Sequence, residues 1–260
     1  MKFSDREWEK FGNKEPYYSI MCDDKYRKES LTSDLISRFF KSGEDFVKYI
    51  TERIRVSVDP TYTRPKNVLD FGCGIGRCSI PLAKIYDRVV GADVSESMLK
   101  KARKNSIEQS ITNVDYVLSD DLLSQISGTF DLIISFEVFH NIPVEREYKI
   151  FENLIGHLSQ NGIMAIDILY YRDEAPITKF MGKLRKSLPL ANNLVNIVMR
   201  RPVFEPLVEK NVYNINKLLY FLDKKDCRNV HIDFYNKNHQ FHIFLFAQKK
   251  TSEISISDFL

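Results

Sequence analysis

Short apolar runs alternate with longer amphipathic stretches between residues 67 and 170 of the chain. The runs are Val68-Leu69, Arg88 to Ala92, Val114 to Leu118, Phe130 to Ser135 and Ile163 to Leu169. Alternation of this kind is typical of strand and helix units that build a parallel sheet. The pattern therefore predicts an α/β fold for the middle of the chain.

Residues 1–65 show a different pattern, which predicts a helical and irregular segment. Ser33-Asp34 is expected to cap a helix that runs through Phe40 and breaks at Gly43. Beyond the glycine, helical spacing continues through Phe46, Ile50 and Ile54, and prolines end the segment at Pro60 and Pro65.

The part after residue 171 is predicted to hold an insertion, a hairpin and a tail. Residues 172–210 interrupt the alternation with four prolines and apolar residues at roughly helical spacing, as expected of an insertion that caps a pocket. The apolar runs His231 to Tyr235 and Phe241 to Gln248 flank a polar stretch and predict a hairpin at the end of the sheet. Residues 251–260 are expected to form a loosely attached tail.

Composition narrows the class of protein. The 260 residues are 43% hydrophobic and 28% charged, with a net charge of +3, which indicates a globular protein without the basic surplus of a nucleic-acid binder. Four cysteines are too few for a disulfide framework and lack the spacing of metal ligands, so no metal is expected. The polar start excludes a signal peptide, and no apolar run approaches the roughly 20 residues of a membrane span. We expect a cytoplasmic protein.

The segment most informative about chemistry is Asn67-Val68-Leu69-Asp70-Phe71-Gly72-Cys73-Gly74-Ile75-Gly76-Arg77. An apolar strand ends in an acidic residue, and glycines at every second position then lead into a helix. Such glycines let the backbone turn tightly and approach a ligand, and the helix start offers free amide groups. The segment predicts a site for a small polar ligand, although a tight turn made only for packing has the same appearance.

Acidic residues end the next two predicted strands. Asp93 follows Gly72 by 21 residues, and its carboxylate is suited to both hydroxyls of a ribose, unless it only caps the helix that follows. Asp120 and Asp121 are suited to the exocyclic amine of a purine, or they only form a turn. Because the carboxyl ends of adjacent strands meet at one edge, these groups predict a nucleoside site.

Residues 66–170 resemble the class I S-adenosylmethionine-dependent methyltransferases, in their small-molecule branch. The spacing Gly-x-Gly-x-Gly behind Asp70 differs from the Gly-x-Gly-x-x-Gly of dinucleotide sites. The stretch from Phe130 to Ser135 looks like the family's fourth strand, and Leu154 to Ile166 is similar to the approach to its fifth, with Gln160-Asn161-Gly162 in place of the usual Lys-Pro-Gly.

This resemblance implies a Rossmann-like, doubly wound, seven-stranded sheet with an antiparallel C-terminal hairpin. It further implies S-adenosylmethionine as cofactor and S-adenosylhomocysteine as product. By position, Asp70, Gly72, the Cys73 backbone and Gly74 would surround the methionine part, and Asp93 the ribose. The adenine would be packed by Val94 and Met98 with Asp120 and Asp121 at its edge, and Phe136 would lie beside the sulfonium.

Two residues after the predicted fourth strand are candidates for catalysis. His140 suits a general base because its ordinary pKa lies near neutrality, or it only orients its loop. Glu137 is a second candidate base, unless it binds the sulfonium end of the cofactor or anchors a helix. The remaining histidines, His157, His231, His239 and His242, are expected to be structural or exposed.

Two further segments could cover the pocket. Trp8, Tyr17 and Tyr18 are expected either to form an amino-terminal lid over the cofactor or to pack in the core. The insertion is rich in Lys and Arg, which would suit either a cap over an anionic substrate or an exposed helical face.

The sequence therefore favours a methyltransferase acting on an oxygen or nitrogen of a small molecule. A methyltransferase for RNA or protein is the first alternative, although the chain lacks the Asn/Asp-Pro-Pro-Tyr/Phe stretch usual for amino-directed methylation of bases or glutamine. A protein that binds the cofactor without turnover is the second. A small-molecule partner is expected, without nucleic acid, and the sequence does not determine the oligomeric state.

Overall fold

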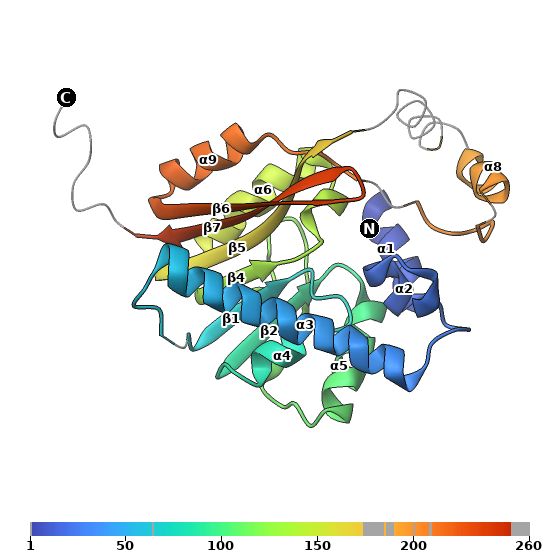
Figure 1. The fold of residues 1–260 in the computed structure, drawn as a ribbon, viewed down its shortest axis with the longest axis horizontal. Helices are drawn as coiled ribbons and strands as arrows, with labels where there is room; N and C mark the ends of the chain where they lie inside the picture. The colour runs from blue at the N-terminus through green and yellow to red at the C-terminus, as the bar shows by residue number, and fades with distance from the viewer. Residues whose placement is uncertain are drawn as a thin grey trace.

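A seven-stranded sheet forms the centre of the molecule (Figure 1). The computed structural model describes residues 2–63, 65–173, 185, 190–199, 201–207 and 210–250. The strand order is β3-β2-β1-β4-β5-β7-β6. The strands are β1 (Asn67–Phe71), β2 (Arg88–Asp93), β3 (Val114–Leu118), β4 (Phe130–Ser135), β5 (Leu158–Arg172), β6 (Cys227–Lys237) and β7 (Gln240–Lys249).

The first five strands are parallel, and β7 lies antiparallel between β5 and β6. The expected Rossmann-like sheet with an antiparallel C-terminal hairpin is confirmed. The hairpin turns at Asn238 and His239, both of which have positive φ angles, of 53° and 59°. Asn tolerates this left-handed conformation better than most residues, so the polar stretch between the two runs favours the turn.

Helices cover both faces of the sheet. Apolar residues of α6 (Val144–Gly156) and α9 (Ile215–Lys224) share one core with β1, β4, β5 and β7. Residues of α3 (Ser33–Arg53) and α4 (Ser79–Ala83) share a second core on the other face, where α3 runs along the sheet (Figure 1). This two-sided burial accounts for the continuous apolar runs of the central strands.

The expected helix break at Gly43 is wrong. Helix α3 continues through this residue to Arg53, and its N-cap is Thr32, whose side chain accepts a bond from the Leu35 amide. A Cβ at position 43 would lie 1.9 Å from the carbonyl oxygen of Arg77. Glycine is needed here because α3 packs directly against the backbone that follows the glycine-rich loop, although glycine interiors weaken helices in general.

The amino-terminal residues form a small layer at one end of the sheet. It consists of α1 (Phe3–Lys14), α2 (Pro16–Met21) and the 3₁₀ turn η1 (Asp24–Tyr26). Their apolar residues form a third core with Phe39 of α3, Ile75 and Met98, the last of which belongs to α5 (Glu96–Glu108). The layer is thereby attached to the loops that follow β1 and β2.

The remaining short elements are η2 (Ile54–Val58), η3 (Phe139–Asn141) and α8 (Ala191–Val198). Most of the expected cap, at 174–184, 186–189, 200 and 208–209, and the expected tail at 251–260 lie outside the described residues. Across the part of the chain that the structure covers, we find no helix with the length and hydrophobicity that a bilayer crossing requires.

Candidate active site

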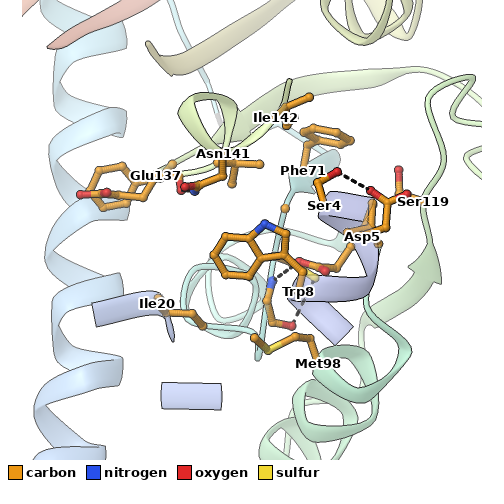
Figure 2. Close-up of a pocket in the computed structure, with 18 of the residues that line it drawn as sticks. Ser4, Asp5, Trp8, Ile20, Phe71, Met98, Ser119, Glu137, Asn141 and Ile142 are labelled. Carbon is orange, nitrogen blue, oxygen red and sulfur yellow. Dashed lines mark hydrogen bonds between the residues drawn. The ribbon is translucent and has the colours of Figure 1, made fainter. Parts of the chain in front are cut away.

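A pocket opens at the carboxyl ends of the parallel strands, where the sequence places the candidate ligand-binding groups. Four loops line it, those that follow β1, β2, β3 and β4, and α1 and α2 close it from outside. Figure 2 shows the Trp8 indole projecting into this pocket, between Ile20 and Met98 on one side and Glu137 and Asn141 on the other. The crevice expected from strand topology is thus present, with an aromatic ring inside it.

The glycine-rich loop is shaped by backbone contacts with β2. The amides of Gly72 and Cys73 both donate to the carbonyl of Ala92, at 2.7 and 3.0 Å. Gly72 has a φ of +77°, and a Cβ there would lie 2.3 Å from a methyl group of Val138. The loop needs glycine at this position for its backbone conformation and for the close approach of the loop after β4.

Asp70 is buried at the end of β1 and lines the pocket. The hydroxyl of Ser79, at the start of α4, donates to one of its oxygens at 2.6 Å. Burial raises the pKa of Asp70 to about 6, although the Ser79 bond and the charge of Arg77 act in the opposite direction. The carboxylate is costly to bury when charged, so a cationic ligand would stabilise it.

Asp93 connects the glycine-rich loop to α5. One oxygen accepts from the Gly74 amide and the other from the Ser95 amide, each at 2.9 Å. The helix cap itself is Ser95, whose hydroxyl accepts from the Met98 amide. Burial raises the pKa of Asp93 to about 6. Asp93, like Asp70, also lines the pocket.

The pocket walls include the apolar residues expected near a bound nucleoside. Val94 and Met98 line it, and Met98 is also part of the amino-terminal core. Phe136 lines the pocket after β4, stacks on Phe46 of α3 at a centroid distance of 3.9 Å, and carries the guanidinium of Arg77 4.8 Å from its ring centre. A ligand would therefore meet apolar surface on both sides.

The two acids after β3 have different partners. Asp120 accepts from the Leu122 and Ser124 amides and from the Ser124 hydroxyl. These bonds stabilise a turn, which is the alternative role that the sequence left open for Asp120. Asp121 binds Arg146 of α6, which also binds Asp5 of α1. Both acids line the pocket, and their roles at an adenine edge stay predictions.

Helix α1 is fastened to the start of α5. The carboxylate of Glu9 accepts from the Ser95 hydroxyl at 2.8 Å, from the Ser97 amide at 3.1 Å and from the Ser97 hydroxyl. Of the three aromatic residues considered for a lid, Trp8 lines the pocket. Tyr17 packs against Phe39, and Tyr18 lies against the guanidinium of Arg27.

His140 and Glu137 lie together after β4, on the side of the pocket that we call its inner end, near the start of η3. His140 is fully buried, and its Nε2 lies 3.6 Å from Oε2 of Glu137. Burial and the charge of Lys210 lower the pKa of His140 well below its ordinary value. Glu137 has a φ of 62°, and the charges of His140 and Lys237 overcome its burial and lower its pKa to about 2. A non-glycine residue in this conformation is unusual and often marks a functional position.

The structure adds three residues that the sequence did not single out. Nδ1 of His140 lies 3.8 Å from Oδ2 of Asp167 on β5, and Nε2 lies 2.5 Å from Nζ of Lys210. Asp167 also accepts from His242 of β7 at 2.9 Å, so His242, expected to be structural or exposed, is buried in this cluster. Asp167 and His242 are far from His140 in sequence and reach it only because β5 and β7 pair in the folded sheet. Their spacing in the sequence gives no sign of this contact.

The same cluster contains a set of potential metal ligands. His140, Asp167 and His242 place one ligand atom each within 4.8 Å of the others. Hydrogen bonds already account for the Asp167 carboxylate, which accepts from the Tyr235 hydroxyl, from His242 and from the Glu137 amide. We therefore interpret the cluster as a hydrogen-bond network around His140.

Parts of the chain are similar in sequence to known methyltransferases. Residues 68–162 match a family model described as a methyltransferase domain. The ubiquinone biosynthesis O-methyltransferase of Coxiella burnetii is 37% identical over 98 residues, which cover 37% of this chain and 38% of the relative. The ribosomal protein L11 methyltransferase of Lactobacillus johnsonii is 26% identical over 151 residues, or 58% of this chain and 44% of the relative. The match thus spans less than half the length of these relatives.

Solved structures share the fold over most of the chain. The magnesium protoporphyrin IX methyltransferase of Synechocystis PCC 6803, with bound S-adenosylhomocysteine, has a TM-score of 0.56 at 17% identity and covers 90% of this chain and 97% of its own. TehB from Haemophilus influenzae has a TM-score of 0.52 at 19% identity, with coverages of 91% and 67%. The match over residues 68–162 identifies a methyltransferase domain in this chain, and the structure shares the fold of methyltransferases solved with bound S-adenosylmethionine or S-adenosylhomocysteine.

Proposed function

We propose that the protein transfers a methyl group from S-adenosylmethionine to an oxygen or nitrogen of a small molecule. The observation that carries this proposal is one pocket with two chemically different ends. The glycine-rich loop, Asp70 and Asp93 line it on the β1 and β2 side, here called the outer end, and Glu137, His140 and Lys210 line it on the β4 and β5 side, the inner end. The outer end suits a nucleoside with a cationic group, and the inner end suits proton transfer.

The residues of the outer end fit the donor. The buried carboxylates of Asp70 and Asp93 would meet its cationic amino-acid part and its ribose hydroxyls, while Val94 and Met98 would contact the adenine. The sulfonium methyl is already activated by its positive charge. The protein's contribution is then to align the acceptor and to exclude water, and the Trp8 ring inside the pocket is suited to the second task.

The enclosure of the pocket supports a small acceptor over a macromolecule. Helices α1 and α2 line it from outside, and the backbone amide of Leu207 donates to Glu7 of α1 at 3.2 Å. The similarity to the L11 methyltransferase, whose name specifies a protein acceptor, nevertheless makes a protein substrate the second candidate. A cytoplasmic location remains our expectation from composition and from the four free cysteines.

The test uses S-adenosylmethionine labelled in its methyl group. The purified protein is incubated separately with a small-metabolite fraction, an RNA fraction and a protein fraction of a cell extract. We expect label and released S-adenosylhomocysteine in the metabolite fraction. Label in the protein or RNA fraction alone would overturn the small-molecule proposal, and donor binding without release in every fraction would indicate a protein that binds without turnover.

A further inference from the structure

Lys210 places an ammonium group at the inner end of the pocket, and no carboxylate of the described residues forms a salt bridge with it. Within the described part of the chain, its Nζ has one hydrogen-bond partner, Nε2 of His140. An ammonium carries three donor hydrogens, so two are left for a ligand. Burial lowers the pKa of Lys210, because its charge is poorly solvated there. A bound anion would relieve that cost.

The backbone holds Lys210 in this position. The amide of the next residue, Asn211, donates to the carbonyl of His140 at 2.7 Å, and the Asn211 side chain donates to the carbonyl of Ile142 at 3.0 Å. The end of the insertion therefore runs alongside η3. The hydrogen bonds of the neighbouring Asn211 thereby hold the Lys210 backbone next to His140.

The charged groups nearest to Lys210 are already engaged elsewhere. Glu137 forms a salt bridge with Lys237 at 2.8 Å. Asp167 accepts from Tyr235, from His242 and from the Glu137 amide. The Cys22 thiol also lines the pocket, and burial raises its pKa, so it carries no charge at neutral pH. Among the described residues of this cluster, none of opposite charge is therefore paired directly with Lys210.

An ammonium can only donate, so Nε2 of His140 accepts and the ring proton lies on Nδ1. That nitrogen is buried and has no hydrogen-bond partner among the described residues. If His140 took up a second proton, carboxylates 3.6 Å from Nε2 (Glu137) and 3.8 Å from Nδ1 (Asp167) would stabilise the imidazolium. Burial and the charge of Lys210 outweigh these carboxylates and keep the ring neutral, so Nε2 has a lone pair that can take a proton once the Lys210 ammonium turns to a bound oxygen.

The side chains that line this end of the pocket indicate what kind of molecule carries the accepting group. Phe136, Val138, Ile142 and Ile20 line the pocket beside His140 and Lys210. A flat apolar ring fits such walls. An aromatic hydroxyl has a pKa of about 10, within reach of an imidazole and an ammonium, whereas a protonated amine would be repelled by Lys210.

We propose that the acceptor is an aromatic hydroxyl whose oxygen is bound by Lys210 and whose proton is taken by His140. This inference rests on the proposed function and narrows it to oxygen. The O–H bond breaks as a bond forms between that hydrogen and Nε2 of His140. The phenolate oxygen then bonds to the methyl carbon as the carbon–sulfur bond breaks, and the electron pair stays on sulfur to give neutral S-adenosylhomocysteine. The proton leaves His140 for solvent after product release.

The experiment uses 4-nitrophenol, whose ionised form absorbs in the visible, as the probe. It is titrated into the full-length protein with bound S-adenosylhomocysteine, at a pH below the probe's own pKa. We expect the bound probe to show the phenolate spectrum, and Lys210→Met to weaken its binding about tenfold or more, as the loss of a charge-assisted hydrogen bond predicts. Lys225→Met removes a partly exposed charge that pairs with Glu152 and does not line the pocket, and it should change binding less than twofold. The isosteric 4-nitroaniline should bind equally to the wild type and to Lys210→Met.

Two results with 4-nitrophenol would contradict the inference. A wild-type complex that does not ionise or bind millimolar 4-nitrophenol overturns the inference, as does equal phenolate binding by Lys210→Met. Calorimetry with S-adenosylhomocysteine on the same preparations separates the two levels. If that ligand binds and the phenol does not, the inference fails and the proposed function stands. If that ligand does not bind to folded protein, the proposed function fails as well.

Discussion

The two ends of the pocket are built in different ways. The outer end, proposed to bind the donor, is made of residues close together in the chain, from Asp70 to Met98, and backbone hydrogen bonds from the glycine-rich loop to β2 set its shape. The inner end, proposed to bind the acceptor, joins side chains from five distant places, Cys22, Glu137 to His140, Asp167, Lys210 and His242. The outer end should therefore keep its shape when distant parts of the chain are substituted. The shape of the inner end depends on how the whole sheet and the insertion pack.

The largest effect is expected from His140→Ala, which tests the acceptor end. Release of S-adenosylhomocysteine in the metabolite fraction should fall about 10²- to 10⁴-fold, the range for loss of a general base, while donor affinity changes little. His231→Ala is the matched control, because His231 pairs with Asp233 on the hairpin. Unchanged turnover of the His140 variant across pH would remove His140 from the mechanism.

The next largest effect is expected from Asp93→Asn, which tests the donor end. Loss of charge-assisted hydrogen bonds to the ribose should weaken donor binding about 100-fold in calorimetry. Asp115→Asn makes the same change on β3, at an exposed residue paired with Arg88, and should bind the donor normally. If both variants bind the donor equally well, Asp93 holds only its own loop.

Donor binding should also depend on pH, because the pKa values of Asp70 and Asp93 are both about 6. Below pH 6 both carboxyls are protonated, so Asp70 loses its attraction for the cationic amino-acid part and Asp93 its charge-assisted hydrogen bonds to the ribose; affinity should rise about tenfold or more from pH 5 to pH 7. The free energy of unfolding of the unliganded protein should fall as the pH rises from 4 to 6. In this range the folded state still holds the two protons that the unfolded chain has released. Calorimetry and thermal unfolding at each pH measure the two trends. Flat donor affinity would mean that neither carboxylate contacts the donor.

The smallest effect is expected from Glu9→Gln, which loosens α1 from the start of α5. The variant loses one charged acceptor for the Ser95 and Ser97 groups, so donor affinity should fall about three- to tenfold. Glu96→Gln, in the exposed first turn of α5 and paired with Arg103, is the control. An unchanged affinity would show that α1 does not cover the bound donor.

The same contrast explains how far the sequence alone leads. Alternation of apolar runs predicts the sheet, and Asp70, the glycines and Asp93 indicate the donor end because they are local in sequence. Gly43 misleads, because its reason for being glycine is a contact with the backbone of Arg77, far along the chain. His242 and Lys210 could not be identified because only the β5 and β7 pairing and the path of residues 210–211 bring them to His140.

The most direct test of the account is calorimetric titration of the folded wild-type protein with S-adenosylhomocysteine and, separately, with NAD. The account predicts saturable binding of S-adenosylhomocysteine at one site per chain and no detectable binding of NAD. Absence of heat with S-adenosylhomocysteine, or tighter binding of NAD, would contradict it.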